Sequence, residues 1–307
     1  MPVVEGAVAT AWAAVSALML FSVANRGCGR DGMFCENSCT RLQTHVQANL
    51  FGQEFAVAQL GDAICDHLAE NYTRKPLVLA LHGPPGVGKS YFHWLLAQSL
   101  YNVTDPVTFQ QCPGAGCPGY HVVFGTDYVA TERDKQAALL QQSLLEHVKS
   151  YPESLVVIEE YDKMDCNSRG LFKQLVERGE TETAEFHRTI VILEANVGWL
   201  QIHELLAGGA GRNQKIDMER AERSLKDAIF AKWVQEGCEE RVDTIKALSM
   251  INMFVPFLPL EQTHLEAVLT VHLKRRAERE VADRQLAQLS WRADVPAWLA
   301  RKADYDG

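Results

Sequence analysis

The sequence predicts an α/β fold in which helices cover both faces of a parallel sheet, followed by a smaller helical subdomain. Three observations lead to this prediction. Short apolar runs alternate with helical patterns, a glycine-rich loop joins the first run to the next helix, and the pattern from about residue 211 onward is helical. Strands that alternate with helices form parallel sheets with helices on both faces.

The elements follow in order along the chain. Residues 77–81 form a continuous apolar run with the length of a buried parallel strand, and three further short segments are strand candidates. The expected strands are residues 77–81, 121–124, 155–158 and 189–193. Apolar residues at helical spacing predict the helices between and around them. The expected helices are residues 50–70, 91–101 and 135–149, with a loop rich in proline, glycine and cysteine at 105–119.

The change from an alternating to a helical pattern predicts the subdomain limits. We expect a large α/β subdomain at residues 45–210 and a small helical subdomain at 211–307. Residues 255–259 (VPFLP) interrupt the helical pattern of the second part. Residues 25–44 are expected to form a cysteine-containing linker.

The first 24 residues stand apart from the rest of the chain. Residues 7–24 contain no charged side chain, and Arg26 and Arg30 follow them. Such a run is typical of a signal peptide or a short membrane anchor, although a buried helix is an alternative. Against targeting, the segment before the run has no Lys or Arg and contains Glu5. We expect residues 1–24 to be a signal peptide or anchor.

Eight cysteines bear on the compartment. Two groups are clustered, one after the apolar run and one in the loop at 105–119. The clustered cysteines are Cys28, Cys35, Cys39, Cys112 and Cys117. In an oxidising compartment these cysteines are disulfide candidates, and free thiols are the alternative. A zinc site is the third and weakest alternative, because no histidine lies near either group at the spacing of zinc ligands. Glycosylation sequons at residues 71–73 and 102–104 add a little weight to a lumenal location.

The charge balance limits the class of partner. Asp and Glu total 39 against 30 Lys and Arg, which gives a formal charge of −9. Nucleic-acid backbones are bound by clustered positive charge. The composition therefore argues against nucleic acid as the main partner.

Residues 83–90 (GPPGVGKS) match the phosphate-binding loop pattern G-x-x-x-x-G-K-[ST] at every fixed position. Glycines let backbone N–H groups point toward an anion, and the following helix N-terminus favours phosphate. We expect Lys89 to reach the phosphates of ATP and Ser90 to ligate Mg²⁺. The expected nucleotide-binding residues are Gly83, Pro84, Pro85, Gly86, Val87, Gly88, Lys89 and Ser90.

Polar residues at the ends of two later strands complete the expected site. Glu159 and Glu160 end the run at 155–158, and Asn196 follows the run at 189–193. We expect Glu159 to hold Mg²⁺ through water, Glu160 to act as the catalytic base, and Asn196 to orient the attacking water. The alternatives are solvated acids at a strand end and an ordinary turn-forming asparagine.

The chain resembles the torsins, AAA+ ATPases related to the Clp/HSP100 unfoldases. The resemblance covers roughly residues 40–285 and is most specific at residues 254–261 (FVPFLPLE). The other matching stretches are residues 49–53 (NLFGQ), 76–83 and 161–164 (YDKM). It implies an ATPase of the endoplasmic reticulum lumen or nuclear envelope, which works as a homo- or hetero-oligomer on protein or membrane-associated partners. It also implies a membrane-bound lumenal activator that supplies an arginine finger.

Several residues depart from the torsin pattern. Ser90 replaces the usual asparagine, Glu159 replaces an aspartate, and no Gly-Cys-Lys motif occurs near the C-terminus, which puts the family's redox-sensitive nucleotide sensor in doubt. Arg212, Arg220 and Arg223 fit a solvated helical face better than an arginine finger. The expected activity is therefore ATP hydrolysis that is weak without an activator; the alternatives are an ATP-binding assembly switch with little hydrolysis and a Clp-like chaperone.

Overall fold

The fold is described from a computed structural model over residues 32–70, 74–103, 112, 116–128, 133–181, 183–208, 217–237, 244–245, 248–282 and 288–303. The apolar run at 7–24, the sequon at 71–73, Thr104 of the second sequon, and Arg212 lie outside these residues. Among the described helices, none has both the length and the apolar character needed to span a bilayer.

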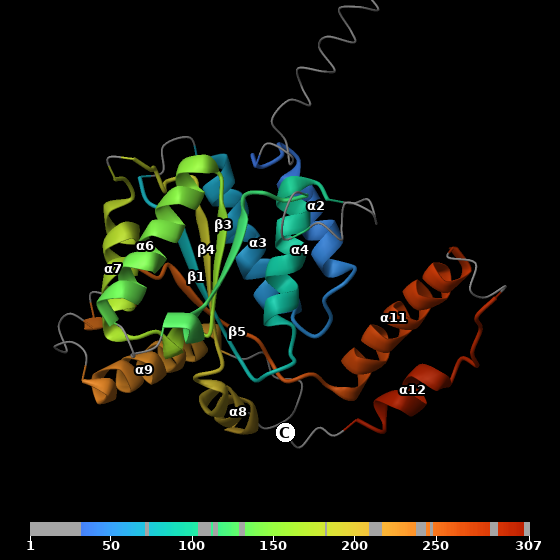
Figure 1. The fold of residues 1–307 in the computed structure, drawn as a ribbon. Coiled ribbons are helices and arrows are strands. Elements are labelled where there is room, and N and C mark those ends of the chain that lie inside the picture. Colours follow the sequence, from blue (N-terminus) through green and yellow to red (C-terminus); the bar gives the residue numbers. More distant parts are fainter. Residues whose placement is uncertain are drawn as a thin grey trace, which may run out of the picture.

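A five-stranded parallel sheet forms the centre of the molecule (Figure 1). The strands lie in the order β2-β3-β4-β1-β5. Their bounds are Leu77–His82 for β1, Tyr120–Phe124 for β2, Leu155–Glu159 for β3, Ile190–Ala195 for β4 and Met253–Pro256 for β5. The four strands expected from the sequence are present, each within two residues of its expected limits.

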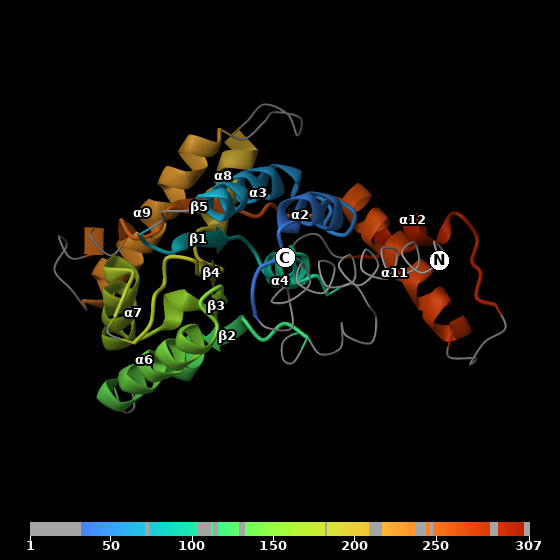
Figure 2. The same ribbon diagram turned by 90° about the horizontal axis from the view of Figure 1, so that it is seen from above.

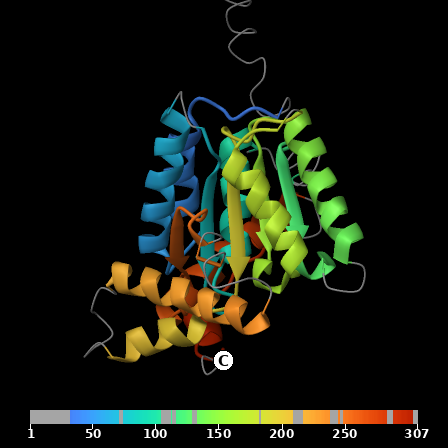
Figure 3. The ribbon, with the colours of Figure 1, turned by 90° about the vertical axis from the view of Figure 1, so that its left-hand side faces the viewer.

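Helices cover both faces of this sheet. One face packs against α2 (Ser38–Gln47), α3 (Glu54–Ala69) and α4 (Lys89–Tyr101). The other packs against α6 (Arg133–Ser150), α7 (Cys166–Arg178) and α9 (Met218–Glu236). Figure 3 shows α9 crossing the molecule near the end of the sheet to which the strand arrows point. The expected three-layer α/β fold is confirmed.

Strands β1, β3 and β4 are apolar except near their carboxyl ends, because both of their faces are buried. In β1, Leu79 and Leu81 belong to the core on the α4 side, whereas Val78 and Ala80 belong to the core on the α6 side. Successive side chains of a strand point to opposite faces, so a doubly covered strand needs apolar residues at every position. This explains why these runs show no polar alternation.

The segment expected to be a linker is partly helical. Within 25–44, residues 38–44 belong to α2, whose Leu42 and Val46 are buried against α4 and its neighbours. A disulfide joins Cys39 in α2 to Cys65 in α3. The sequence missed this helix because most of its side chains are polar and only one of its faces is apolar.

The expected purely helical character after residue 210 is wrong. Residues 253–256 form β5, which pairs in parallel with β1 at one edge of the sheet. The proline-rich run at 255–259 looks like a break in the sequence, but Pro256 ends an edge strand, a position where proline is tolerated. α8 (Trp199–Gly208) and α9 also lie beside the sheet (Figure 1).

The helices that stand apart from the sheet are α11 (Gln262–Ala282) and α12 (Val295–Ala300). They pack against each other and extend to one side of the sheet (Figure 2). We therefore propose that the small helical subdomain begins near residue 260 rather than at 211.

Candidate nucleotide site

The glycine-rich loop lies between β1 and α4, at the carboxyl end of β1. Gly86 and Gly88 have φ angles of +78° and +102°, which side chains with a Cβ rarely adopt. Gly88 is the residue before the first turn of α4, so the loop leads directly into the N-terminus of that helix. This is the local geometry that phosphate binding requires.

Lys89 folds back over the loop that precedes it. Its Nζ donates to the carbonyl oxygens of Gly83 (3.0 Å) and Pro84 (2.9 Å) and to Oδ1 of Asn196 (2.9 Å). Only 4% of Lys89 is exposed. Burial lowers the pKa of Lys89, and the negative charges of nearby acids oppose that shift. The lysine is thus a buried cation held at the phosphate-binding loop.

Asn196 lies beside the loop, as expected from the sequence. It directly follows β4, and its side-chain oxygen accepts the hydrogen bond from Lys89 described above. Because β4 and β1 are parallel neighbours, the ends of both strands reach the same edge of the sheet. The structure therefore brings together two residues that are 107 positions apart in the sequence.

The Ser90 hydroxyl bonds to an acid that the motif did not identify. Its Oγ donates to both carboxylate oxygens of Glu194, at 2.9 and 3.0 Å. Glu194 lies on β4 directly opposite Glu159 on β3 in the strand register. Two carboxylates and a hydroxyl therefore meet beside the loop, where the sequence predicted one carboxylate and the hydroxyl.

Glu160 follows β3 but its carboxylate is engaged elsewhere. Its Oε1 accepts a 2.8 Å hydrogen bond from Nζ of Lys163, and its own backbone is left-handed with φ of 53°. This hydrogen bond raises the pKa of Lys163. A carboxylate that acted as a base would have to exchange this partner for water.

His93 is a site residue that sequence reasoning missed. It lies one turn after Ser90 on α4, with Nε2 3.3 Å from Oε1 of Glu159 and 3.4 Å from Oε2 of Glu194. Burial alone would lower the pKa of His93, but the two carboxylates outweigh that effect and raise it. The available signal was its i,i+3 spacing from Ser90, which places both side chains on one face of a helix.

Buried contacts fix the segment that follows β3. His82, at the end of β1, is fully buried; its Nδ1 donates to the carbonyl of Val197 at 2.8 Å, and its Nε2 accepts from Tyr161 Oη at 2.9 Å. Asp162 forms a 3.2 Å ion pair with Lys232 of α9. These contacts connect the three strand ends that carry the site.

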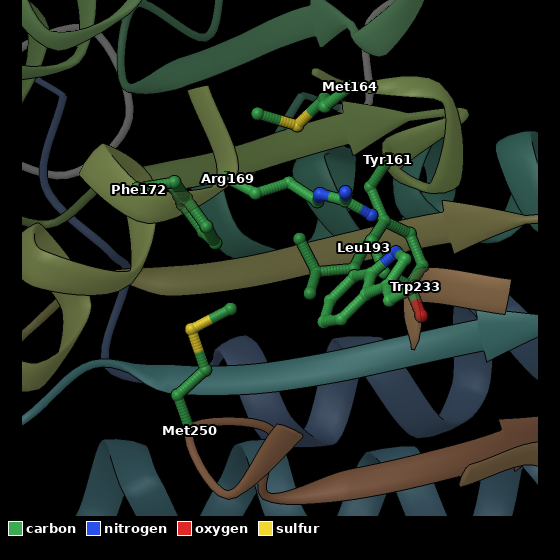
Figure 4. A pocket seen from close by; sticks show the side chains of 7 residues that line it. All are labelled: Tyr161, Met164, Arg169, Phe172, Leu193, Trp233 and Met250. Atoms are coloured by element: carbon green, nitrogen blue, oxygen red, sulfur yellow. The ribbon is translucent and has the colours of Figure 1, made fainter. Parts of the chain in front are cut away.

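A small pocket lies on the other side of this segment (Figure 4). Trp233 of α9 packs edge-on against Tyr161, and the Arg169 guanidinium lies 4.8 Å from the centre of the Trp233 ring. The pocket has a volume of about 10 Å³ and none of its lining residues belongs to the glycine-rich loop. It has room for about one water molecule and cannot hold a nucleotide.

The residues at the loop fit a magnesium–nucleotide complex. Backbone N–H groups at a helix N-terminus and a lysine bind phosphate, and carboxylate and hydroxyl oxygens are the donors that Mg²⁺ prefers. Lys89 and Ser90 begin α4 and Glu159 ends β3. The charge of Glu159 acts on Lys89, and Ser90 bonds to Glu194, the neighbour of Glu159 in the sheet. Arg220 and Arg223, in contrast, are exposed on α9, and the Arg223 Nε donates to its own helix.

Comparison with known proteins shows two families to which the chain is similar. The torsin family profile matches residues 25–110, and the profile of the ATPase family associated with various cellular activities (AAA) matches residues 79–217. The chain is thus similar to the torsins in its first part and to the AAA ATPases in its middle part. The torsin match spans the region of α2, α3 and the loop, and the AAA match spans the loop and the strands β2 to β4.

Three relatives show the extent of the likeness. A torsin-like protein of Caenorhabditis elegans is 26% identical over 246 residues, which are 78% of this chain and 65% of that protein. Torsin-3A of Rattus norvegicus is 25% identical over 78% of this chain and 59% of its own length. Chaperone protein ClpB of Yersinia enterocolitica is 28% identical over 80% of this chain and 26% of its own. The chain thus spans less than two thirds of the first two relatives.

Proposed function

We propose that this torsin-like protein is an ATPase that binds Mg·ATP at residues 83–90 and couples its hydrolysis to the remodelling of protein or membrane-associated partners. The observation that carries the proposal is the hydrogen bond between Lys89 and Asn196. It joins the phosphate-binding lysine to the end of β4, so that one edge of the sheet holds both nucleotide-binding and water-orienting groups.

Each residue would have a definite role. ATP supplies the phosphoanhydride that is cleaved, and its Mg²⁺ offsets phosphate charge. Lys89 would exchange its loop carbonyls for phosphate oxygens, and Ser90 with Glu159 would hold the metal. Asn196 would orient the attacking water and Glu160, once released from Lys163, would accept its proton.

We further propose that the protein works in an oxidising compartment, namely the lumen of the endoplasmic reticulum or nuclear envelope. Disulfides join Cys39 to Cys65 and Cys112 to Cys117, and Cys35 and Cys166 are also disulfide-bonded. Structural disulfides persist in oxidising compartments and are rare in the cytosol. The resemblance to the torsins implies the same location.

Assembly with other subunits and with a lumenal activator is part of the proposal. AAA+ proteins generally oligomerise, and an arginine supplied by another chain raises nucleotide hydrolysis by ~10³–10⁵-fold. Arg220 and Arg223 are exposed and engage no partner acid in the described contacts, which suits a solvated helix face. Hydrolysis by the isolated chain is therefore expected to be slow.

The second candidate function is an ATP-dependent assembly switch that hydrolyses little. The bond between Glu160 and Lys163 favours it, because a base held by a lysine is unavailable to water. The two functions differ in turnover rather than in ATP binding.

Phosphate release by a Glu160→Gln variant tests the proposal. Glutamine keeps the shape of the side chain but cannot accept the proton, so turnover should fall by ~10²–10⁴-fold while ATP binding remains. Glu177→Gln, which changes an exposed acid on α7, should turn over like the unchanged protein. If Glu160→Gln hydrolyses ATP at the normal rate, Glu160 is not the base. If the unchanged protein is as inactive as the variant, with or without a lumenal activator domain, the switch function replaces the ATPase.

A further inference from the structure

We propose that His93, Glu159 and Glu194 form a protein-ligated site for a divalent transition metal, which the chain holds in the absence of nucleotide. The inference rests on the proposed function in one respect, because Glu159 serves both the proposed Mg·ATP site and this one. It adds an ion of a different chemical class and a ligand, His93, that the nucleotide motifs do not include.

Two of the three distances between the ligand atoms have the spacing of a coordination sphere. The Nε2 of His93 lies 3.3 Å from Oε1 of Glu159 and 3.4 Å from Oε2 of Glu194, and all three ligand atoms lie within 4.8 Å of one another. Metal bonds of ~2.0–2.1 Å at tetrahedral angles place neighbouring ligand atoms ~3.3–3.4 Å apart. The two histidine-to-carboxylate distances therefore fit one shared ion.

The imidazole is held in the orientation that a metal ligand needs. The Nδ1 of His93 is 2.7 Å from the hydroxyl of Tyr120, which fixes the ring through its other nitrogen. His93 is 3% exposed, and its Nε2 is buried without a hydrogen bond of good geometry. A metal-binding histidine typically has its second nitrogen engaged in this way, while the first points at the ion.

The negative charges of Glu159 and Glu194 also favour a cation at this site. Glu159 and Glu194 face each other across β3 and β4, and their side chains are 23% and 12% exposed. Lys89 is close enough to be affected by both acids, but its Nζ is bonded to Gly83, Pro84 and Asn196. Two partly buried carboxylates repel each other unless a cation lies between them. A proton on His93 or a metal ion can fill that role.

The donor set selects the class of ion. Imidazole is a good ligand for Zn²⁺, Co²⁺ and other first-row transition metals, whereas Mg²⁺ prefers oxygen donors. Two carboxylates with one histidine thus favour a transition metal over Mg²⁺. The Ser90 hydroxyl, exposed and bonded to Glu194, lies beside the cluster and leaves a direction from which water or a phosphate oxygen can reach the ion.

Metal binding without nucleotide tests the proposal directly. The full chain, without a polyhistidine tag, is titrated with Co²⁺ and its visible absorption and heat of binding are recorded. We expect one Co²⁺ per chain with the spectrum of a nitrogen- and oxygen-ligated ion, displaced by Zn²⁺ and retained in a large excess of Mg²⁺. If the chain keeps its circular dichroism spectrum but binds neither Co²⁺ nor Zn²⁺, the proposal is overturned. A proton on His93 would then be the cation that offsets the two carboxylates.

Matched variants assign the ligands. His93→Gln and Glu194→Gln should each lower Co²⁺ affinity at least tenfold, and Tyr120→Phe, which removes only the contact with the second nitrogen, should lower it ~10–100-fold. His272→Gln, an exposed histidine on α11, should bind Co²⁺ like the unchanged protein. Unchanged affinity in His93→Gln would contradict the assignment.

Two further measurements separate this proposal from folding and from the proposed function. If His93→Gln does not fold, pulsed electron paramagnetic resonance of Cu²⁺ bound to the unchanged protein replaces it. Coupling of Cu²⁺ to a histidine nitrogen supports the proposed site if the Tyr120→Phe substitution changes that coupling. Absence of any nitrogen coupling overturns the proposal. Lys89→Ala should lose ATP binding but keep Co²⁺ binding. The metal-site proposal and the proposed function can therefore fail independently of each other.

Discussion

At the scale of single residues, His82 shows how a buried side chain connects the site to the fold. It is fully buried at the end of β1, donates to the carbonyl of Val197 and accepts from Tyr161. The bond that Nε2 accepts from Tyr161 requires the neutral imidazole. Burial lowers the pKa of His82 to about 4, the hydrogen bond to Val197 opposes the shift, and the charge of Lys89 adds to it.

This pKa predicts a loss of stability in acid. The ordinary pKa of histidine is ~6.5. Between pH 6.5 and about 4, His82 is therefore protonated in the unfolded chain but neutral in the folded protein. Above pH 6.5 the titration of His82 therefore leaves the free energy of unfolding unchanged. From there down to about pH 4 this free energy falls by ~1.4 kcal/mol per pH unit. Urea unfolding at pH 7, 6 and 5 should show a shallower pH dependence for His82→Gln than for the unchanged protein. His203→Gln, at an exposed position, should leave the slope unchanged, whereas equal slopes for His82→Gln and the unchanged protein would show that His82 titrates normally.

The site residues differ in how far sequence could find them. Lys89 and Ser90 could be predicted from a local motif, because phosphate binding requires that spacing of residues. Asn196 could be predicted because it is a polar residue at a strand end. Glu194 and His93 could not be found in this way. Their importance depends on the register of β3 against β4 and on the face of α4 that meets those strands, and both are set by packing between distant segments.

At the scale of elements, α2 and β5 show where local patterns fail. α2 has an apolar face only where Leu42 and Val46 meet α4, so its sequence resembles a linker until its neighbours are known. β5 is four residues long and ends in Pro256, and it forms a strand because β1 offers an unpaired edge. By contrast β1, β3 and β4 were predicted because both of their faces are buried and nearly every position before their carboxyl ends is apolar.

The disulfide between α2 and α3 gives the element-scale prediction. Cys39 and Cys65 are separated by 26 residues, and closing a loop of that length in the unfolded chain is worth ~3–4 kcal/mol. The double variant Cys39→Ala, Cys65→Ala should therefore lower the free energy of unfolding by ~3 kcal/mol in urea without reductant. Cys112→Ala, Cys117→Ala opens a loop of only five residues and should lose less, ~2 kcal/mol. A first variant as stable as the unchanged protein would show that the bridge does not form in solution.

At the scale of the whole molecule, the nucleotide loop is tied to the C-terminal helices. The Gln53 side chain donates to the carbonyls of Val87 (3.2 Å) and Leu258 (2.8 Å) and accepts from the Leu258 N–H. Arg275 of α11 donates to the side chain of Asn49. The loop that would hold ATP and the segment that leads to α11 therefore share hydrogen bonds with one buried glutamine.

The order of the strands explains why this edge forms a site. β1 lies between β4 and β5, so the loop after β1 has the end of β4 beside it and the end of β3 next along the sheet. Ligands of open α/β sheets bind at the carboxyl ends of the strands. The sequence predicted four of the five strands and the polar ends of β3 and β4. It did not predict the strand order, because pairing between strands depends on contacts over long separations.

Equilibrium binding of Mg·ATP to Lys89→Ala tests the central claim most directly. By isothermal titration, the unchanged protein should bind one ATP per chain, and Lys149→Ala, which removes an exposed lysine on α6, should bind equally well. Lys89→Ala should lose at least ~100-fold in affinity, because a buried cation that would bond directly to phosphate is gone. Binding of ATP by Lys89→Ala with unchanged affinity would contradict the assignment of residues 83–90 as the nucleotide site.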